Sequence, residues 1–142
     1  MSYFADADDL YATLGAMLEE VLSDDELGPL FSRADCVIRW VCSDPDAEIT
    51  VRLERGREPR IDFGPSPLVP DVTMEMAADV AHGFWLGKVN VALALTRGQI
   101  VASGPVDRIL RFVPLASRAF PFYHRLLADR GRSESLPGAA VA

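Results

Sequence analysis

The sequence predicts an α+β domain, because runs with strand periodicity and runs with helix periodicity follow one another along the chain. Residues 6–22 carry apolar side chains at the spacing of one amphipathic helix. Residues 36–63 alternate apolar and polar side chains, which is typical of strands joined by turns. Residues 71–128 contain both patterns in alternation, so strands and helices must pack on one another there.

Length and composition are those of one soluble globular domain. The chain has 142 residues, of which 49% are hydrophobic and 25% charged, and its net charge is −7. That charge argues against nucleic acid, whose phosphates require clustered cations, and against steering to anionic lipid surfaces. No apolar run is long enough to span a bilayer, so we expect no stable membrane insertion. The first residues carry acids and no basic leader, and we therefore expect a cytoplasmic protein.

We expect residues 1–130 to form the single domain and residues 131–142 to form a flexible C-terminal tail. The first element is a helix over residues 6–22, whose buried stripe comprises Leu10, Leu14, Met17, Leu18 and Val21. Residues 23–26 then have the composition of a helix start, and Gly28-Pro29 is expected to end this short second helix.

The next segment predicts three strands, at residues 36–43, 49–54 and 60–63, connected by turns. Cys36 and Cys42 have the same parity on the first strand and lie roughly 20 Å apart at strand rise, too far for a disulfide. We interpret them as buried thiols. The outward faces of adjoining strands collect charges that are expected to pair across the sheet, namely Arg39, Arg52, Glu54, Asp62 and Glu75.

The second half begins with a strand in which Val72, Met74 and Met76 share the buried face. A helix containing Phe84 and Trp85 follows, and Asn90 is placed to cap a further short helix that contains Leu93 and Leu95. After a strand at residues 99–103, one apolar stripe of the next helix is formed by Val106, Ile109, Leu110 and Val113. Pro114 is expected to stop that helix, and a last helix over residues 116–128 contains Phe120.

The run GFWLGKVNVALALTRGQIVASG at residues 83–104, together with the order of elements around it, resembles the sterol carrier protein type two family. The order of the predicted helices and strands resembles that of the family over residues 1–128. The resemblance implies a curved, mostly antiparallel β-sheet whose covering helices enclose an apolar tunnel. It also implies non-enzymatic binding or transfer of a hydrophobic small molecule such as a fatty acyl chain, sterol or polyketide-like lipid.

Large flexible apolar side chains dominate the second half of the chain, and at these spacings they are typical of a closed core. The resemblance favours a pocket lining instead. The expected lining comprises Met74, Met76, Phe84, Trp85, Leu93, Leu95, Ile109, Val113 and Phe120. We expect no cofactor and no metal ion, since the sequence shows neither a phosphate loop nor a cluster of metal-ligating residues.

Two alternatives remain open at this point. One is an enzyme that shapes a hydrophobic substrate for isomerisation or cyclisation, with His82 assisting, because Asp79 lies three residues earlier on the same helix. The non-catalytic interpretation of His82 is a partly exposed histidine near a helix start. The other alternative is a packing or dimerisation module with a filled core, which would act as a homodimer.

Overall fold

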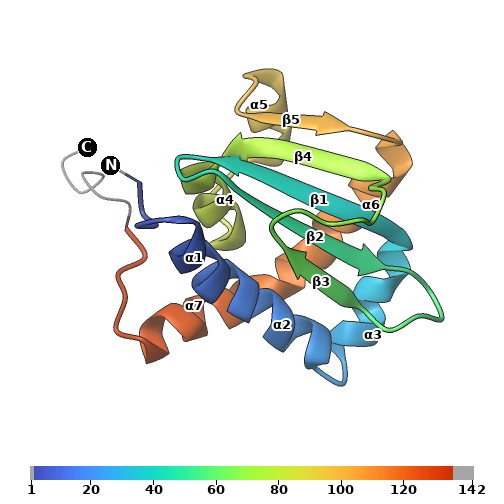
Figure 1. Cartoon of the computed structure of the whole chain (residues 1–142), viewed down its shortest axis with the longest axis horizontal. Coiled ribbons are helices and arrows are strands. Elements are labelled where there is room, and N and C mark those ends of the chain that lie inside the picture. The colour runs from blue at the N-terminus through green and yellow to red at the C-terminus, as the bar shows by residue number, and fades with distance from the viewer. Residues whose placement is uncertain (1, 136–142) are drawn as a thin grey trace.

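The protein is described by a computed structural model that covers residues 2–135. Its five strands form one sheet in the order β3-β2-β1-β4-β5 (Figure 1). The strands are β1 (Cys36–Ser43), β2 (Ala47–Leu53), β3 (Arg60–Phe63), β4 (Val72–Ala77) and β5 (Ile100–Ser103). β1 and β4 pair in parallel, and the other three neighbouring pairs are antiparallel. The predicted α+β fold with a mostly antiparallel sheet is confirmed.

The N-terminal helix is continuous and consists of α1 (Ala7–Leu10), a π-helical segment (Tyr11–Gly15) and α2 (Ala16–Ser23). Asp6 caps it, because the Asp6 carboxylate accepts a hydrogen bond from the Asp9 N–H. All five residues of the predicted stripe are buried. A Cβ at Gly15 would lie 2.6 Å from the Phe63 ring of β3, so glycine allows the helix to approach this edge of the sheet closely.

A short helix, α3 (Leu27–Phe31), and a 3-10 turn (Ser32–Ala34) lead into the sheet. The Asp24 carboxylate accepts from the N–H groups of Glu26 and Leu27, as expected of a helix start. The prediction that Gly28-Pro29 ends the helix is wrong. Pro29 lies in the first turn, where a missing N–H breaks no helical hydrogen bond, and the helix therefore continues to Phe31.

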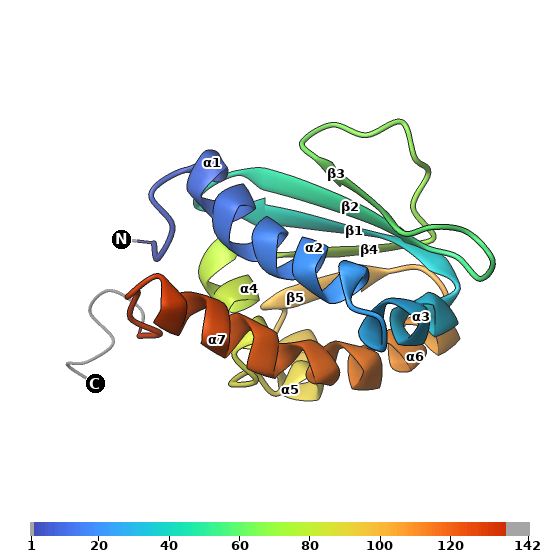
Figure 2. The same ribbon diagram turned by 90° about the horizontal axis from the view of Figure 1, so that it is seen from below.

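The remaining helices are α4 (Ala78–Trp85), α5 (Val91–Thr96), α6 (Val106–Ala116) and α7 (Phe120–Asp129), with a 3-10 turn (Ser117–Ala119) between the last two. Asn90 caps α5 as predicted, since its side-chain oxygen accepts from the Leu93 N–H. Figure 2 shows the sheet as one layer, with α4, α6 and α7 in a second layer beneath it. None of the described helices is long and apolar enough to cross a membrane.

Helix α6 differs from its prediction in two ways. Its core contacts are made by Phe112 and Ala116, whereas Val106 and Leu110 of the predicted stripe are 67% and 65% exposed. Pro114 does not stop the helix, which continues to Ala116. Pro114 is exposed, so the helical hydrogen bond that its missing N–H cannot make is lost on the solvent side, where water can replace it.

The hydrophobic core lies between the inner face of the sheet and the helices. Strand alternation places Ile38, Trp40, Ile49, Val51 and Met74 on that face, and all five are buried. The two cysteines are buried free thiols, as predicted. The core is therefore continuous across the three central strands.

The outer face of the sheet is covered in part by the loop between β3 and β4. Arg39 donates to the Thr50 hydroxyl over 3.0 Å and to the Leu68 carbonyl over 2.7 Å, which ties this loop to β1 and β2. Arg52 Nε lies 3.7 Å from the Glu54 carboxylate, but both residues belong to the end of β2, and Arg39 donates to uncharged groups, so the charge pairing expected across adjoining strands is not what these residues make. The outer face is thus a network of polar side chains, and the apolar interior lies on the opposite side.

Candidate ligand pocket

Four residues of the predicted lining meet in the core. Met74, Met76, Phe84 and Trp85 are each buried, on β4 and α4. The Trp85 ring packs edge-on against the Phe112 ring of α6, with centroids 6.4 Å apart. These side chains fill the space between the sheet and the second layer, so the structure brings them together as a closed cluster.

Three further lining residues lie at the border of this cluster. Phe120 is half-buried and packs edge-on against Phe84, with ring centroids 6.0 Å apart. A Cβ at Gly87 would lie 2.8 Å from the Phe120 ring, and Gly87 has the positive φ of 80° expected after a helix end. Ile109 and Val113 on α6 are also half-buried.

Leu93 and Leu95 are not brought to the cluster. They are 42% and 38% exposed on α5, and within this helix only Ala94 is buried. The α5 sequence VALALT has no polar residue before its last position, so its periodicity could not show which side faces inward. The structure therefore divides the predicted lining into an inner set and an exposed pair.

Trp40 is the site residue that the sequence reasoning missed. It lies at the centre of the inner sheet face, between Ile49 of β2 and Met74 of β4, and packs against Trp85 and Phe112. Its indole N–H is buried and has no hydrogen-bond partner among the described residues. Such a group costs about 1–3 kcal/mol in a protein interior. The sequence signal that could have indicated Trp40 is its position on β1, two residues after Ile38, which places both side chains on the inner face.

A pocket of about 410 Å³ lies on the outer side of α4. Its apolar wall comprises Val80, Gly83, Leu86 and Val89. Its polar wall comprises Asp79, His82, Lys88, Gln99, Glu134 and Ser135. The pocket thus lies between α4, the connection to α5 and the segment that follows α7.

His82 forms the floor of this pocket and is fully buried, which corrects the expectation of a partly exposed side chain. Its Nε2 lies 2.8 Å from the Glu134 carbonyl oxygen, which can only accept, so Nε2 carries the proton. Nδ1 then accepts from the Tyr123 hydroxyl over 2.6 Å. The Tyr3 ring stacks on the imidazole at 3.7 Å, and burial lowers the pKa of His82 and raises the pKa of Tyr123.

Asp79 does not orient His82, because its carboxylate accepts instead from the Tyr3 N–H over 2.8 Å. The segment after α7 is tied down by side chains. Arg132 pairs with Asp9 over 2.8 Å and lies over the Tyr3 ring, and Glu134 pairs with His124. Residues 131–135 of the predicted tail are therefore fastened to α1 and α7, and residues 136–142 lie outside the described part of the chain.

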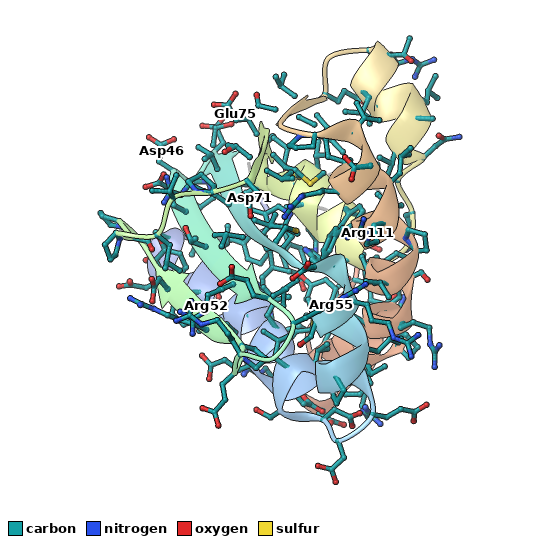
Figure 3. The ribbon with its side chains drawn as sticks, turned by 90° about the vertical axis from the view of Figure 1, so that its right-hand side faces the viewer. Asp46, Arg52, Arg55, Asp71, Glu75 and Arg111 are labelled. Carbon is teal, nitrogen blue, oxygen red and sulfur yellow. The ribbon has the colours of Figure 1, made fainter. Side chains whose placement is uncertain are left out.

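Two larger pockets of about 710 Å³ each lie on the surface of the described region. One is at the end of the sheet and is lined by Asp46, Glu48 and Glu75, of which Figure 3 labels Asp46 and Glu75. The other lies between α3 and the β2–β3 turn. Within residues 2–135, no group of three or more His, Cys, Asp or Glu side chains is arranged to hold a metal ion.

Sterol carrier protein domains are among the solved structures with the same fold. The sterol carrier protein domain 2 of Helicoverpa armigera superposes with a TM-score of 0.67 at 17% identity, over 79% of this chain and 89% of that one. Sterol carrier protein 2 from Yarrowia lipolytica, in its apo form, gives a TM-score of 0.61 at 14% identity, over 80% and 91%. Palmitated sterol carrier protein 2-like 2 from Aedes aegypti gives 0.54 at 17% identity, over 74% and 95%.

Sequence comparison finds no matching family model and no matching curated protein. The likeness is therefore one of structure, and it confirms the fold that the sequence resemblance implied. The chain therefore shares its α+β fold with sterol carrier protein 2 domains.

Proposed function

We propose that the protein binds a hydrophobic small molecule in its interior, between the inner sheet face and helices α4, α6 and α7. The ligand would be a fatty acyl chain, sterol or polyketide-like lipid, carried without covalent change. The fold supports this, since one similar structure is a palmitated form. The single observation that carries the proposal is the unpartnered indole N–H of Trp40 at the centre of the apolar cluster.

An oxygen atom of a ligand is the natural partner for this donor. A carboxylate, carbonyl or hydroxyl group beside Trp40 would accept its hydrogen bond, while the rest of the molecule replaced contacts with Met74, Trp85 and Phe112. Methionines suit such a wall, because their unbranched side chains adopt several shapes at little energy. Each buried methylene contributes about 0.8 kcal/mol, so a chain of about eight carbons would reach micromolar affinity after association costs.

The geometry does not favour His82 as a general base. Both of its ring nitrogens are engaged, one with Tyr123 and one with the Glu134 carbonyl, and Tyr3 covers one ring face. A base needs a free nitrogen within hydrogen-bond reach of the substrate. We therefore assign His82 to the architecture of the α4 pocket and not to proton transfer.

The substitution Trp40→Phe tests the proposal. It removes the N–H and keeps an aromatic ring, so the affinity for a pyrene-labelled fatty acid should fall about tenfold, the equivalent of one hydrogen bond. Trp85→Phe is the matched control, because it removes a similar volume from the same cluster. Titration followed by fluorescence, with urea unfolding of each variant, measures affinity and stability separately.

The expected pattern is specific. Trp40→Phe should weaken binding more than Trp85→Phe and destabilise the fold less, since it also removes an unsatisfied buried donor. Absence of binding of the fatty acid and of a labelled sterol to the wild-type protein would support the filled-core packing module instead. Equal affinity in wild type and Trp40→Phe would remove Trp40 from the ligand site.

A further inference from the structure

Arg132 anchors the segment that follows α7. Its guanidinium donates to both carboxylate oxygens of Asp9, over 2.8 and 3.3 Å, and to the Thr13 hydroxyl over 3.0 Å. It also lies over the Tyr3 ring, 4.7 Å from the ring centroid. A guanidinium and a carboxylate that bind each other in this way both keep their charges throughout the neutral pH range. Arg132 is therefore the fixed end of this segment.

Beyond this anchor, both histidines of the sequence hold Glu134. Nε2 of His82 donates to the Glu134 carbonyl oxygen over 2.8 Å, and Nδ1 of His124 lies 2.5 Å from the Glu134 carboxylate. Glu134 and Ser135 also line the α4 pocket. Residues 133–135 therefore form a clasp that covers one side of this pocket and is fastened at Glu134.

The contacts of His124 require a proton on each nitrogen of its ring. Nε2 lies 2.9 Å from the Leu86 carbonyl oxygen, which can only accept a hydrogen bond. Nδ1 faces the Glu134 carboxylate, which also only accepts when it is ionised. A neutral imidazole has one N–H and could make only one of these two bonds. The geometry is therefore that of a charged imidazolium.

We infer that the clasp is a pH-sensitive device, which is fastened over the α4 pocket while His124 is protonated and opens when His124 loses its proton. Loss of the proton removes the charge that attracts the Glu134 carboxylate. The clasp is then held only by the hydrogen bonds that the carbonyl groups of residues 133 and 134 accept from Tyr3 and His82. When it opens, the Nε2–H of His82 on the pocket floor becomes available to water or to an oxygen atom of a ligand.

The charges around His124 determine the direction of this response. The Glu134 carboxylate and the Leu86 carbonyl, at the end of α4, favour the imidazolium, whereas Lys88 in the α4–α5 connection repels it. Together they raise the pKa of His124 above its ordinary value. The clasp is therefore fastened below about pH 6.5 and opens as the pH rises through the raised pKa.

The other groups that hold the segment keep their protonation states over this range. Burial lowers the pKa of His82, so its ring stays neutral, and burial raises the pKa of Tyr3, so its hydroxyl keeps its proton. Burial would raise the pKa of Asp9, but the hydrogen bonds that its carboxylate accepts, that from Arg132 above all, lower it below its ordinary value. Among the described contacts of the segment, the one that responds to pH near neutrality is that of His124.

Nuclear magnetic resonance of the histidine rings tests the inference, because the sequence contains only His82 and His124. Long-range proton–nitrogen spectra of isotope-labelled protein report the protonation of each ring, and the exchange of the His82 Nε2 proton with water reports opening of the clasp. Comparison with His124→Gln at the same pH cancels the intrinsic effect of pH on exchange. At about pH 5.5 the wild-type proton should exchange about two- to fivefold more slowly than that of the variant, the range of an ion pair at a partly exposed site. At about pH 8.5 the two rates should be equal.

Glu134→Gln removes the charge of the clasp and keeps the backbone carbonyl that His82 binds. It should lower the midpoint of the His124 titration and make the His82 exchange rate equal to that of His124→Gln at every pH. Glu20→Gln is the matched control, because Glu20 pairs over 3.8 Å with Arg125, the neighbour of His124 on α7, and lies outside the clasp. This control should leave the titration and the exchange as they are in the wild-type protein.

Three results would overturn the inference: a His124 midpoint that is the same in wild type and Glu134→Gln, a ratio of exchange rates that does not change with pH, or an equal effect of Glu20→Gln. If His124→Gln does not fold, the comparison of wild type with Glu134→Gln decides the question by itself. These measurements require no ligand. Failure of this inference is therefore distinguishable from failure of the proposed ligand binding.

Discussion

Tyr123→Phe should destabilise the protein far more than the loss of one oxygen atom suggests. The Tyr123 side chain is fully buried, and its hydroxyl donates to Nδ1 of His82 over 2.6 Å. Without it, Nδ1 becomes a buried acceptor with no partner, which costs about 1–3 kcal/mol. At an unfolding entropy of about 2.1 cal/mol/K per residue, the melting temperature should fall by about 3–10 °C.

Thermal unfolding followed by circular dichroism at neutral pH measures this shift. Tyr3→Phe is the control, because the Tyr3 hydroxyl donates to the Ser133 carbonyl at an exposed position and its loss leaves no buried group unsatisfied. A Tyr123→Phe shift no larger than that of Tyr3→Phe would refute the reasoning. It would mean that the hydrogen bond to His82 contributes nothing to folding.

Four further predictions concern the pH dependence of stability, a backbone clash and local opening. Burial lowers the pKa of His82 in the folded state. Its stabilising contribution is therefore complete above about pH 6.5 and is lost as the pH falls. In His82→Gln, the urea concentration at the unfolding midpoint should decline less in acid than it does in the wild-type protein. His124 has the opposite sign, since Glu134 raises its pKa and its contribution is lost as pH rises above about 6.5; His124→Gln should therefore destabilise more in acid than in base. Gly104→Ala should destabilise by more than about 3 kcal/mol, because a Cβ at its φ of 122° would lie 2.2 Å from the Asp71 carbonyl oxygen. In amide hydrogen exchange, α5 should exchange faster than α4.

Each of these has a result that would contradict it. For the histidines, it is a pH profile unchanged by either substitution. Gly56→Ala is the backbone control, since Gly56 also has a positive φ but no neighbouring atom within 4 Å, and an equal loss at both glycines would rule out the clash. Equal protection of α4 and α5 would show that α5 is held as firmly as the core.

Much of the fold could be predicted from the sequence, because burial and periodicity agree wherever one face of an element is apolar and the other polar. β1 has the predicted bounds Cys36–Ser43, and the N-terminal helix has its predicted stripe. Helix α6 could not be oriented in this way. It has apolar residues on two sides, and Phe112, which anchors it, is not part of the regular stripe of Val106 and Leu110.

The candidate site was harder to predict, since it depends on contacts between segments far apart in the chain. His82 is buried by Tyr3, Tyr123 and Glu134, which lie 79, 41 and 52 positions away in the chain, and no local pattern around His82 indicates them. Trp40 was predictable as an inward side chain. Its missing hydrogen bond was not, because the positions of all neighbouring acceptors must be known first.

The helices on the two sides of the interior are held by different contacts, and this difference indicates where a ligand would enter. On one side, α4 and α7 are joined to the N-terminal segment and to residues 131–135 by the polar contacts of His82, Tyr123 and Arg132. On the other side, α5 is held by the burial of Ala94 and by its connection to β5. Opening on the first side would break buried hydrogen bonds, at about 1–3 kcal/mol for each unsatisfied group, whereas moving α5 breaks few apolar contacts. The route that breaks the fewest contacts leads past the exposed leucines of α5, so we expect a ligand to enter the interior on this side.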